Sequence, residues 1–290
     1  MRDKLRRGGP PVQSAGRRGV GQLGRHIGQP AHPGGPHLAT AEVANPAGPV
    51  VRIFGIHAVA AALANPERRL RRLYLTDNAE HRLRDARRQR GVTAERVHSK
   101  DLDRRLGAGS VHQGALLEAE SLPDRTLEEL CARAGQGRPL VVLDQVISPQ
   151  NVGAILRSAA VFGAAGLIMT RRNSPTLAGV LAKSASGAVE HVPVALVTNL
   201  ARALQSIAEL GLRLIGLDGD ADELIEDAEA AGPVALVLGA EGKGLRRLTR
   251  EGCDALVRIG ARGAITSLNV SNAAAIALYV VTTERRSADT

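Results

Sequence analysis

The pattern of apolar and polar residues in the second half of the chain alternates between two kinds of segment. Short continuous apolar runs have the length of buried strands, and the stretches between them repeat apolar residues at helical spacing. The expected strands are residues 140–143, 166–170, 212–217, 234–238 and 255–259, and the expected helices are residues 152–163, 177–186, 198–210 and 272–279. This alternation predicts an α/β domain whose mostly parallel sheet is covered on both faces.

Two of the expected helices carry informative details. The helix at 152–163 has an apolar stripe made of Val152, Ile155, Leu156 and Ala159. Arg157 falls outside that stripe, so we expect its side chain to face away from the core. The helix at 272–279 follows a polar loop, and Ser271 is a residue that can cap it.

The first half of the chain differs in composition and in the length of its predicted elements. Residues 1–49 are rich in Gly, Pro, Arg and Gln and lack apolar periodicity, which predicts a disordered basic arm. From residue 51 the elements become short and regular, and they predict a small α/β domain near the minimum size that folds alone. Its expected elements are helices at 57–64 and 80–90, a further helix that Ser99 can cap, and strands at 70–75 and 111–117.

These patterns divide the chain into four parts. The predicted parts are an arm at 1–49, a small domain at 50–120, a linker at 121–138 with a possible short helix at 127–134, and a larger domain at 139–285. The linker mixes Pro, Gly and charged residues, which is typical of a connection between domains.

The charge balance indicates a polyanionic partner. The formal net charge is +9 and the pI is near 10.6, which favours RNA or DNA over a membrane surface. An arginine-rich proteome is the alternative source of this composition. Aromatic residues make up only 1% of the chain, so stacking of bases on aromatic rings is a weak model. Two arginine runs in the small domain predict an RNA-docking surface that includes Arg71, Arg72, Arg87 and Arg88, although each run alone is typical of a solvated face.

Other classes of protein find little support in the sequence. Cys131 and Cys253 are far apart and have no partners at metal-ligand spacing, so we expect no disulfide framework and no metal site, as fits a reducing cytoplasm. No apolar run reaches the length of a membrane span. The loop after residue 143 lacks the G-x-G-x-x-G pattern of dinucleotide sites, and Gly242-Lys243 lacks the rest of a P-loop. Ser267 does not lie in a nucleophile elbow.

Three motifs in the larger domain carry the chemistry. The first is made of Asp144, Pro149, Asn151, Gly153 and Arg157, the second is Gly-Ala-Glu-Gly-Lys-Gly at 239–244, and the third is Ser-Leu-Asn-Val-Ser at 267–271. In order and separation they resemble the motifs of the SpoU (TrmH) family of RNA ribose 2′-O-methyltransferases. The small domain resembles the substrate-binding domain of that family through Phe-Gly-Ile-His-Ala-Val at 54–59 and His-Gln-Gly at 112–114. The resemblance covers nearly all of residues 51–283.

The resemblance implies a fold, a cofactor and an assembly. It implies a knotted, SPOUT-type methyltransferase domain with a parallel sheet, preceded by a smaller α/β substrate-binding domain of the L30e-like type. It also implies S-adenosylmethionine as the methyl donor and a homodimer with the active site at the subunit interface. Within the family, the chain most resembles the bacterial RlmB-type enzymes that methylate a guanosine of 23S rRNA. The basic arm before residue 51 departs from the family pattern.

The resemblance also implies roles for single residues. Gly239, Ile259 and Leu268 are expected to contact the cofactor through their backbone. Arg157 is the residue that the family marks as central, and Asn151, Glu241, Ser267 and Asn269 are expected to complete the catalytic site. Arginine stays protonated, so Arg157 is expected to grip a substrate phosphate and orient the ribose hydroxyl instead of acting as a free base. Taken singly, each of these residues also has a structural reading as a helix cap, a turn residue or a surface charge.

Two further functions stay open at this point. A tRNA 2′-O-methyltransferase of the same family would carry the same motifs, although the separate small domain favours rRNA. A non-catalytic RNA-binding or ribosome assembly factor could keep the fold, but the intact Asn151, Arg157, Glu241 and Asn269 argue against such decay.

Overall fold

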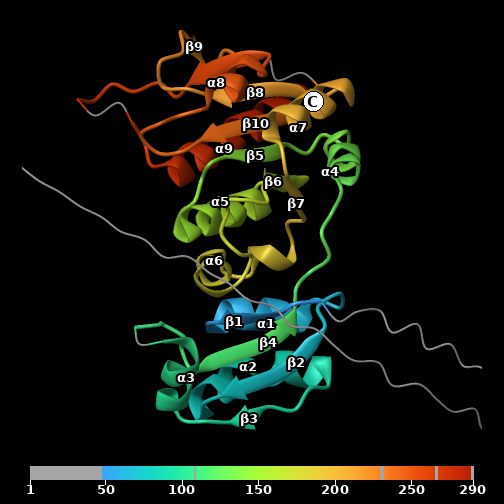
Figure 1. The fold of residues 1–290 in the computed structure, drawn as a ribbon, viewed down its shortest axis with the longest axis vertical. Helices are drawn as coiled ribbons and strands as arrows, with labels where there is room; N and C mark the ends of the chain where they lie inside the picture. Colours follow the sequence, from blue (N-terminus) through green and yellow to red (C-terminus); the bar gives the residue numbers. More distant parts are fainter. Residues whose placement is uncertain (1–47, 108, 229–231, 265–266, 289–290) are drawn as a thin grey trace, which may run out of the picture. The chain divides into compact units, whose positions relative to one another are not determined.

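The structure, a computed structural model, describes residues 48–107, 109–228, 232–264 and 267–288 (Figure 1). The side chains of residues 284–288 are not described. All but the last two residues of the predicted arm at 1–49 lie outside the described residues. None of the described helices combines the length and the apolar character that crossing a membrane would require.

Two separate sheets organise the described residues. The smaller sheet has four strands in the order β1-β4-β2-β3, and the larger has seven in the order β7-β6-β5-β10-β8-β11-β9. Every pairing in the larger sheet is parallel. The predicted α/β class, with a parallel-sheet domain and a separate small domain before it, is therefore confirmed.

The smaller sheet is mixed and is flanked by three helices. Its elements are β1 (Val50–Phe54), α1 (Ile56–Ala64), β2 (Leu70–Leu75), α2 (Asp77–Arg90), β3 (Glu95–Arg96), α3 (Ser99–Leu106) and β4 (Ala115–Glu120). The last strand begins four residues later than the apolar pattern predicts. Gln113 and Gly114 have φ values of 54° and 81°, so the chain turns there before it can enter the sheet.

The larger sheet and its helices follow the predicted alternation, except that β7 and β9 are strands that the apolar pattern did not predict. The strands are β5 (Leu140–Asp144), β6 (Gly166–Thr170), β7 (Val194–Val197), β8 (Arg213–Leu217), β9 (Glu223–Leu224), β10 (Val234–Gly239) and β11 (Ala255–Arg258). The helices are α4 (Leu127–Ala134), α5 (Pro149–Val161), α6 (Gly179–Ser184), η1 (Ala188–Glu190), α7 (Leu200–Glu209), α8 (Arg247–Glu251) and α9 (Val270–Ala288).

Alternate side chains of the central strand β10 pack into two core layers, one on each face of the sheet. Leu236 and Leu238 pack in the layer that contains buried residues of α5 and α9, whereas Val237 packs in the layer that contains buried residues of α4 and α7. The whole stripe of α5 predicted from the sequence is buried. Helix α4 lies in the predicted linker, yet its Leu130 is fully buried against the larger sheet.

The position of β10 determines which loops lie together at the carboxyl ends of the strands, where ligands of such sheets bind. This strand comes late in the chain but lies between β5 and β8, with Gly239 opposite Asp144 in the register. A Cβ atom on Gly239 would overlap the backbone of Gly244 and Leu245, so only glycine fits where the following loop folds back. The knot implied by the resemblance stays a prediction.

A buried ion pair joins the smaller domain to the larger one. Arg68 donates from Nε and Nη2 to the two carboxylate oxygens of Glu190, at 3.1 and 2.6 Å, and from Nη1 to the carbonyl of Glu120 at 2.8 Å. The two side chains are 1% and 2% exposed. Asn65 donates a further hydrogen bond to the same carboxylate at 2.8 Å. A bidentate, fully partnered geometry of this kind is what a buried ion pair needs to offset its desolvation.

We predict that Arg68→Ala destabilises the junction between the two domains by about 3–5 kcal/mol, because it leaves the Glu190 carboxylate buried without its cation. Urea unfolding gives the loss in free energy, and amide hydrogen exchange at residues 188–190 locates it. The control is Arg125→Ala, which removes an exposed pair with Glu67 and should cost less than about 1 kcal/mol. Equal losses for the two variants would contradict the prediction.

Candidate functional site

Three segments that are distant in the chain meet in one hydrogen-bonded group of side chains, here called the amide–carboxylate cluster: Asn151, Glu241 and Asn269. Asn151 lies in the first turn of α5, Glu241 in the loop after β10, and Asn269 directly before α9. Asn151 donates from Nδ2 to Glu241 Oε1 at 3.0 Å, and Asn269 donates from Nδ2 to Asn151 Oδ1 at 3.1 Å. Asn269 Nδ2 also contacts Glu241 Oε1. The three predicted site residues are therefore brought together.

Helix starts position two members of this cluster. The hydroxyl of Ser148 caps α5 by accepting from the amide of Asn151 at 3.4 Å, with Pro149 at the first helical position. Asn269 Oδ1 accepts from the amide and the hydroxyl of Ser271, at 2.9 and 2.6 Å. The expectation that Ser271 caps this helix is wrong, because α9 begins earlier, at Val270, and the Asn269 side chain accepts from the amide of Ser271.

Arg157 does not join this cluster in the single chain. It is exposed, as the stripe predicted, and among the described residues it makes no hydrogen bond or ion pair with Asn151 or Glu241. Six residues along a helix correspond to a rise of roughly 9 Å and a turn away from the face of Asn151. Arg157 instead lines a cavity of about 320 Å³ together with His57, Ser186 and His191.

The predicted cofactor residues lie at the carboxyl ends of the strands. Gly239 ends β10, and Ile259 directly follows β11, two strands away along the same edge. Leu268 is 48% exposed and precedes Asn269. Among the described residues, the backbone amides and carbonyls of Ile259 and Leu268 have no hydrogen-bond partner. Ser267 is exposed and makes no side-chain hydrogen bond within the described part of the chain.

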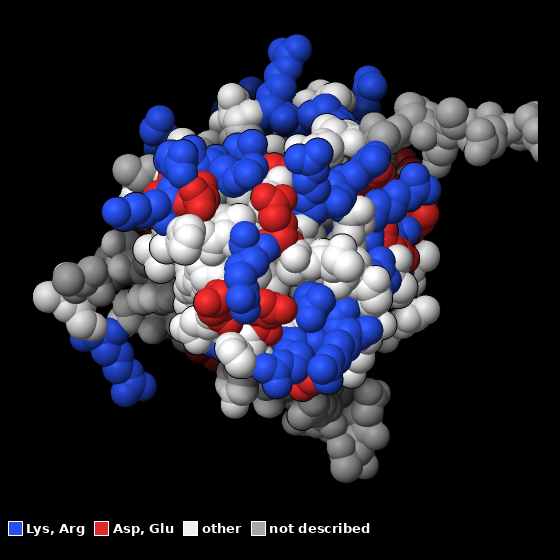
Figure 2. Space-filling model, turned by 90° about the horizontal axis from the view of Figure 1, so that it is seen from below, with Lys and Arg blue, Asp and Glu red and all other residues white. Residues whose placement is uncertain are grey.

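The predicted RNA-binding arginines differ in whether their side chains form ion pairs with carboxylates of the same chain. Arg71 pairs with Glu120, and Arg87 lies 3.5 Å from Glu80. Arg72 is exposed, and a hydrogen bond with the Tyr74 hydroxyl raises the pKa of its guanidinium. Arg88 is exposed and has no ion-pair partner in the described ranges. Figure 2 views the surface from below and shows groups of Lys and Arg with Asp and Glu between them.

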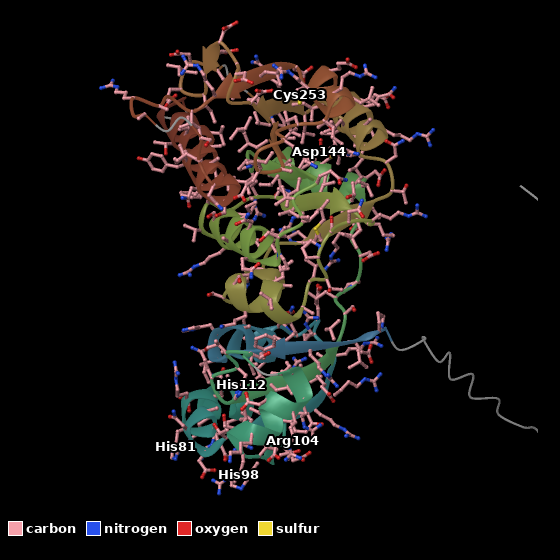
Figure 3. All side chains as sticks on the ribbon, turned by 60° about the vertical axis from the view of Figure 1, so that its left-hand side comes forward. His81, His98, Arg104, His112, Asp144 and Cys253 are labelled. Atoms are coloured by element: carbon pink, nitrogen blue, oxygen red, sulfur yellow. The ribbon has the colours of Figure 1, made fainter. Side chains whose placement is uncertain are left out.

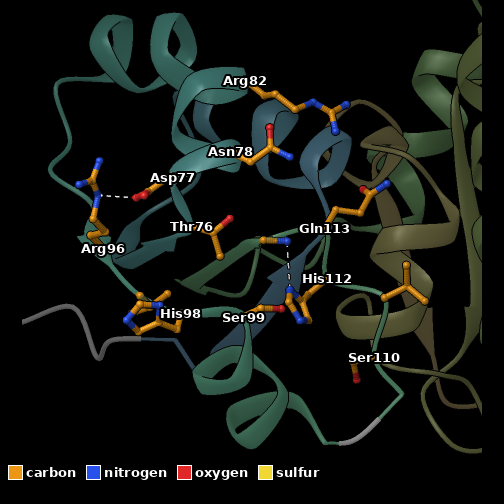
Figure 4. Close-up of a pocket in the computed structure, with 13 residues that line it drawn as sticks. Thr76, Asp77, Asn78, Arg82, Arg96, His98, Ser99, Ser110, His112 and Gln113 are labelled. Atoms are coloured by element: carbon orange, nitrogen blue, oxygen red, sulfur yellow. Dashed lines mark hydrogen bonds and ion pairs between the residues drawn. The ribbon is translucent and has the colours of Figure 1, made fainter.

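A cavity in the smaller domain was not predicted from the sequence. It measures about 790 Å³, and its polar lining includes Arg82, Arg96, His98 and His112 (Figure 4). His112 is 6% exposed and is held by the amide of Gly114 at 3.0 Å and by Asp103 at 3.2 Å. Arg96 is held by Asp77 at 2.6 Å. The His-Gln-Gly triplet at 112–114 lines this cavity and is the sequence signal that could have located it.

Neither cysteine is placed for chemistry. Burial raises the pKa of the Cys131 thiol to about 11 and that of Cys253 to about 12, and the carboxylates of Asp254 and Asp144 add to the second shift. Both thiols therefore stay protonated at neutral pH. Figure 3 labels Cys253 and Asp144 in the larger domain. The described residues contain no group of three His, Cys, Asp or Glu side chains that could hold a metal ion.

Known protein families match both the larger and the smaller domain. The profile described as the SpoU rRNA Methylase family matches residues 138–279, and the profile described as RNA 2′-O ribose methyltransferase substrate binding matches residues 52–124. A Shewanella oneidensis protein named 23S rRNA (guanosine-2′-O-)-methyltransferase RlmB is 41% identical over 242 residues, covering 81% of this chain and 98% of the relative.

Solved structures share the fold. The SpoU methyltransferase AviRb from Streptomyces viridochromogenes, crystallised with AdoMet, is 25% identical and superposes with a TM-score of 0.68 over 82% of this chain and 91% of its own. A crystal structure of an RNA 2′-O ribose methyltransferase is 26% identical and has the same TM-score over 81% of this chain and 89% of its own.

We predict that Glu241→Ala loosens the start of α9, because Glu241 Oε1 is the acceptor shared by two asparagine amides and by the amide of Val270 at 3.4 Å. Amide hydrogen exchange at Val270 and Ser271 should accelerate by roughly tenfold, the equivalent of one lost hydrogen bond to a charged group. Glu251→Ala is the control, since that carboxylate contacts only Arg247 on the exposed face of α8. Unchanged exchange at Val270 would contradict the prediction.

Proposed function

Because this chain belongs to the SpoU rRNA methylase family, we propose that it transfers a methyl group from S-adenosylmethionine to the ribose 2′-hydroxyl of a guanosine in 23S rRNA. The observation that carries the proposal is the convergence of Asn151, Glu241 and Asn269, from three separate motifs, at one end of the parallel sheet. Ligands of open α/β sheets bind at the carboxyl ends of the strands. The relative named for this reaction is 41% identical and is covered over nearly its whole length.

The backbone at the sheet edge fits the cofactor. The unpartnered amides and carbonyls of Ile259 and Leu268 can hydrogen-bond an adenine edge, and Gly239 presents backbone without a side chain. When bound, S-adenosylmethionine supplies an electrophilic methyl group on a cationic sulfur. The work of the chain is then to hold donor and hydroxyl in line, because positioning provides a large share of the acceleration of such a transfer.

Arg157 has the properties of a substrate-gripping residue. It is exposed, it carries no ion pair within the described ranges, and it lines a cavity. A guanidinium binds phosphate bidentately and stays protonated, so Arg157 orients the nucleotide and polarises the 2′-hydroxyl. A phosphate oxygen that it holds is the group that can take the hydroxyl proton. The amide–carboxylate cluster keeps the first turn of α5, and with it Arg157, in register with the cofactor loops.

A homodimer would complete the site at Arg157. Val161 follows Arg157 by one helical turn and is 73% exposed, and Tyr279 on the packed helix α9 is 57% exposed. The Tyr279 ring contacts Phe162 edge-on, with 6.2 Å between the ring centroids. Large exposed apolar side chains on adjoining helices favour burial against a second copy. Such a contact would bring residues of the partner over Arg157.

The smaller domain is proposed to hold the RNA. Its cavity, with Arg82, Arg96 and two histidines, and its exposed Arg72 and Arg88 support contacts to a polyanion. Ribosomal RNA as substrate also implies that the enzyme works in the cytoplasm.

We predict that the wild-type protein methylates unmodified 23S rRNA when it is given labelled S-adenosylmethionine. Arg157→Ala should lower the rate of methyl transfer by at least about 100-fold, because the reactants are no longer held in position. Cofactor affinity measured by calorimetry should stay within about twofold, because none of the residues expected to hold the cofactor lines the cavity at Arg157. Arg202→Ala, an exposed arginine on α7, is the control. Methyl transfer by Arg157→Ala near the wild-type rate would refute the role of Arg157, and transfer to tRNA alone would refute the substrate.

We predict that Val161→Asp converts the protein to a monomer and abolishes methyl transfer, because a charge placed on the proposed contact cannot be buried. Sedimentation velocity measures the assembly. Leu210→Asp, which places the same charge on an exposed apolar residue directly after α7, should leave the dimer intact. A wild-type protein that is monomeric yet active would overturn the dimer proposal.

A further inference from the structure

A third cavity opens at the carboxyl ends of the strands of the larger sheet. It measures about 500 Å³ and is bordered by the residues that follow β5, β6 and β7 and by the segment that begins α8. We call it the arginine cavity. Its lining includes Gln145, Thr170, Arg172, Asn173, Arg246 and Arg247.

The lining of the arginine cavity is cationic and contains no carboxylate. Arg172 is exposed and has no ion-pair partner among the described residues, while its own carbonyl accepts from the Thr170 hydroxyl at 2.7 Å. Arg247 is paired only with Glu251, in an exposed pair of the kind that contributes little. Three guanidinium groups facing one cavity indicate an anionic ligand.

Arg246 is held in a fixed orientation by a buried acid. Asp144 is completely buried and accepts from the Arg246 amide at 2.9 Å and from its Nε at 2.6 Å. The two terminal nitrogens of Arg246 have no partner within the described residues, and the side chain is 52% exposed. The carboxylate therefore aims the guanidinium, and its free N–H groups remain available to a ligand.

The backbone at the rim of the cavity is also unusual. Gln145 and Asn173 have φ values of 60° and 62°, although neither is glycine. Residues in this sparsely populated region cluster at ligand sites, where the surrounding structure maintains the strain. Both belong to the loops that follow adjacent strands, β5 and β6, so the strain lies where the cavity opens.

The arginine cavity lies one strand away from the proposed cofactor edge. Gln145 follows Asp144, and Asp144 is opposite Gly239 in the register of β5 and β10. If one ribose of an RNA chain lies near Gly239, the backbone of the neighbouring nucleotides passes this cavity. A cavity of this size accepts a phosphate with part of its sugar.

We propose that the arginine cavity binds a phosphodiester of the RNA backbone that flanks the methylated nucleotide. The proposal rests on the proposed function for the identity of the polyanion. Phosphate contacts set the register of a protein on a nucleic acid without reading sequence. Arg172 and Arg247 therefore act on RNA affinity and not on the methyl transfer itself.

The test compares Arg172→Gln with Arg171→Gln, which removes the same charge one residue earlier. Arg171 pairs with Asp124 at 2.8 Å and does not line the cavity, so it is a matched control. Fluorescence anisotropy with a 23S rRNA fragment measures the Kd over a range of KCl concentrations. Arg172→Gln should raise the Kd roughly tenfold, the effect of one lost charged hydrogen bond. It should also lower the slope of log Kd against log salt by about 0.7–0.9.

Arg247→Gln should behave in the same way as Arg172→Gln. Neither variant should change cofactor affinity or the rate of methyl transfer at saturating RNA. Equal effects of Arg171→Gln and Arg172→Gln would overturn the proposal, as would a loss of cofactor affinity with an unchanged RNA Kd. If the wild type binds but does not methylate this RNA, the proposed function fails, while a weaker Arg172→Gln complex would still support the subsite. If the wild type methylates and Arg172→Gln binds equally well, the subsite alone fails.

Discussion

A buried carboxylate anchors the functional edge of the larger sheet. Asp144 has no exposed surface, yet it keeps its charge partnered through two hydrogen bonds to Arg246. Burial of an ion is costly unless its geometry is well satisfied, so these contacts fix the end of β5 against the segment after β10. Asp144 holds Arg246, which lines the arginine cavity. It also lies opposite Gly239 in the register, two residues before Glu241 of the amide–carboxylate cluster.

Much of the fold followed from periodicity. The apolar runs of β5, β6, β8 and β10 stood out because these strands are buried on both faces, and the stripe of α5 is fully buried as predicted. Strands β1 and β7 were not predicted, and neither were β3 and β9, which have two residues each and are too short to show an alternating pattern. Strand β4 begins late because the turn at Gln113 and Gly114 depends on positive φ values that apolarity does not encode.

The candidate site was less accessible to reasoning from the sequence. The meeting of Asn151, Glu241 and Asn269 came from the resemblance, since nothing in their spacing reveals a shared acceptor. The separation of Arg157 from Asn151 was accessible from helix geometry, because six residues do not return to the same face. The arginine cavity was not accessible, because Arg172 and Arg246 come from distant loops and meet only when the sheet forms.

The place of β10 between β5 and β8 has a consequence for how the chain is made. Strands β5, β6 and β7 leave the ribosome while their central neighbour is still being translated. Until Val234–Gly239 emerges, one edge of β5 has no partner and its apolar faces are only partly covered. Pairings over such sequence distances form slowly and leave intermediates prone to aggregation. During synthesis, the incomplete sheet is therefore expected to need protection until β10 has been translated.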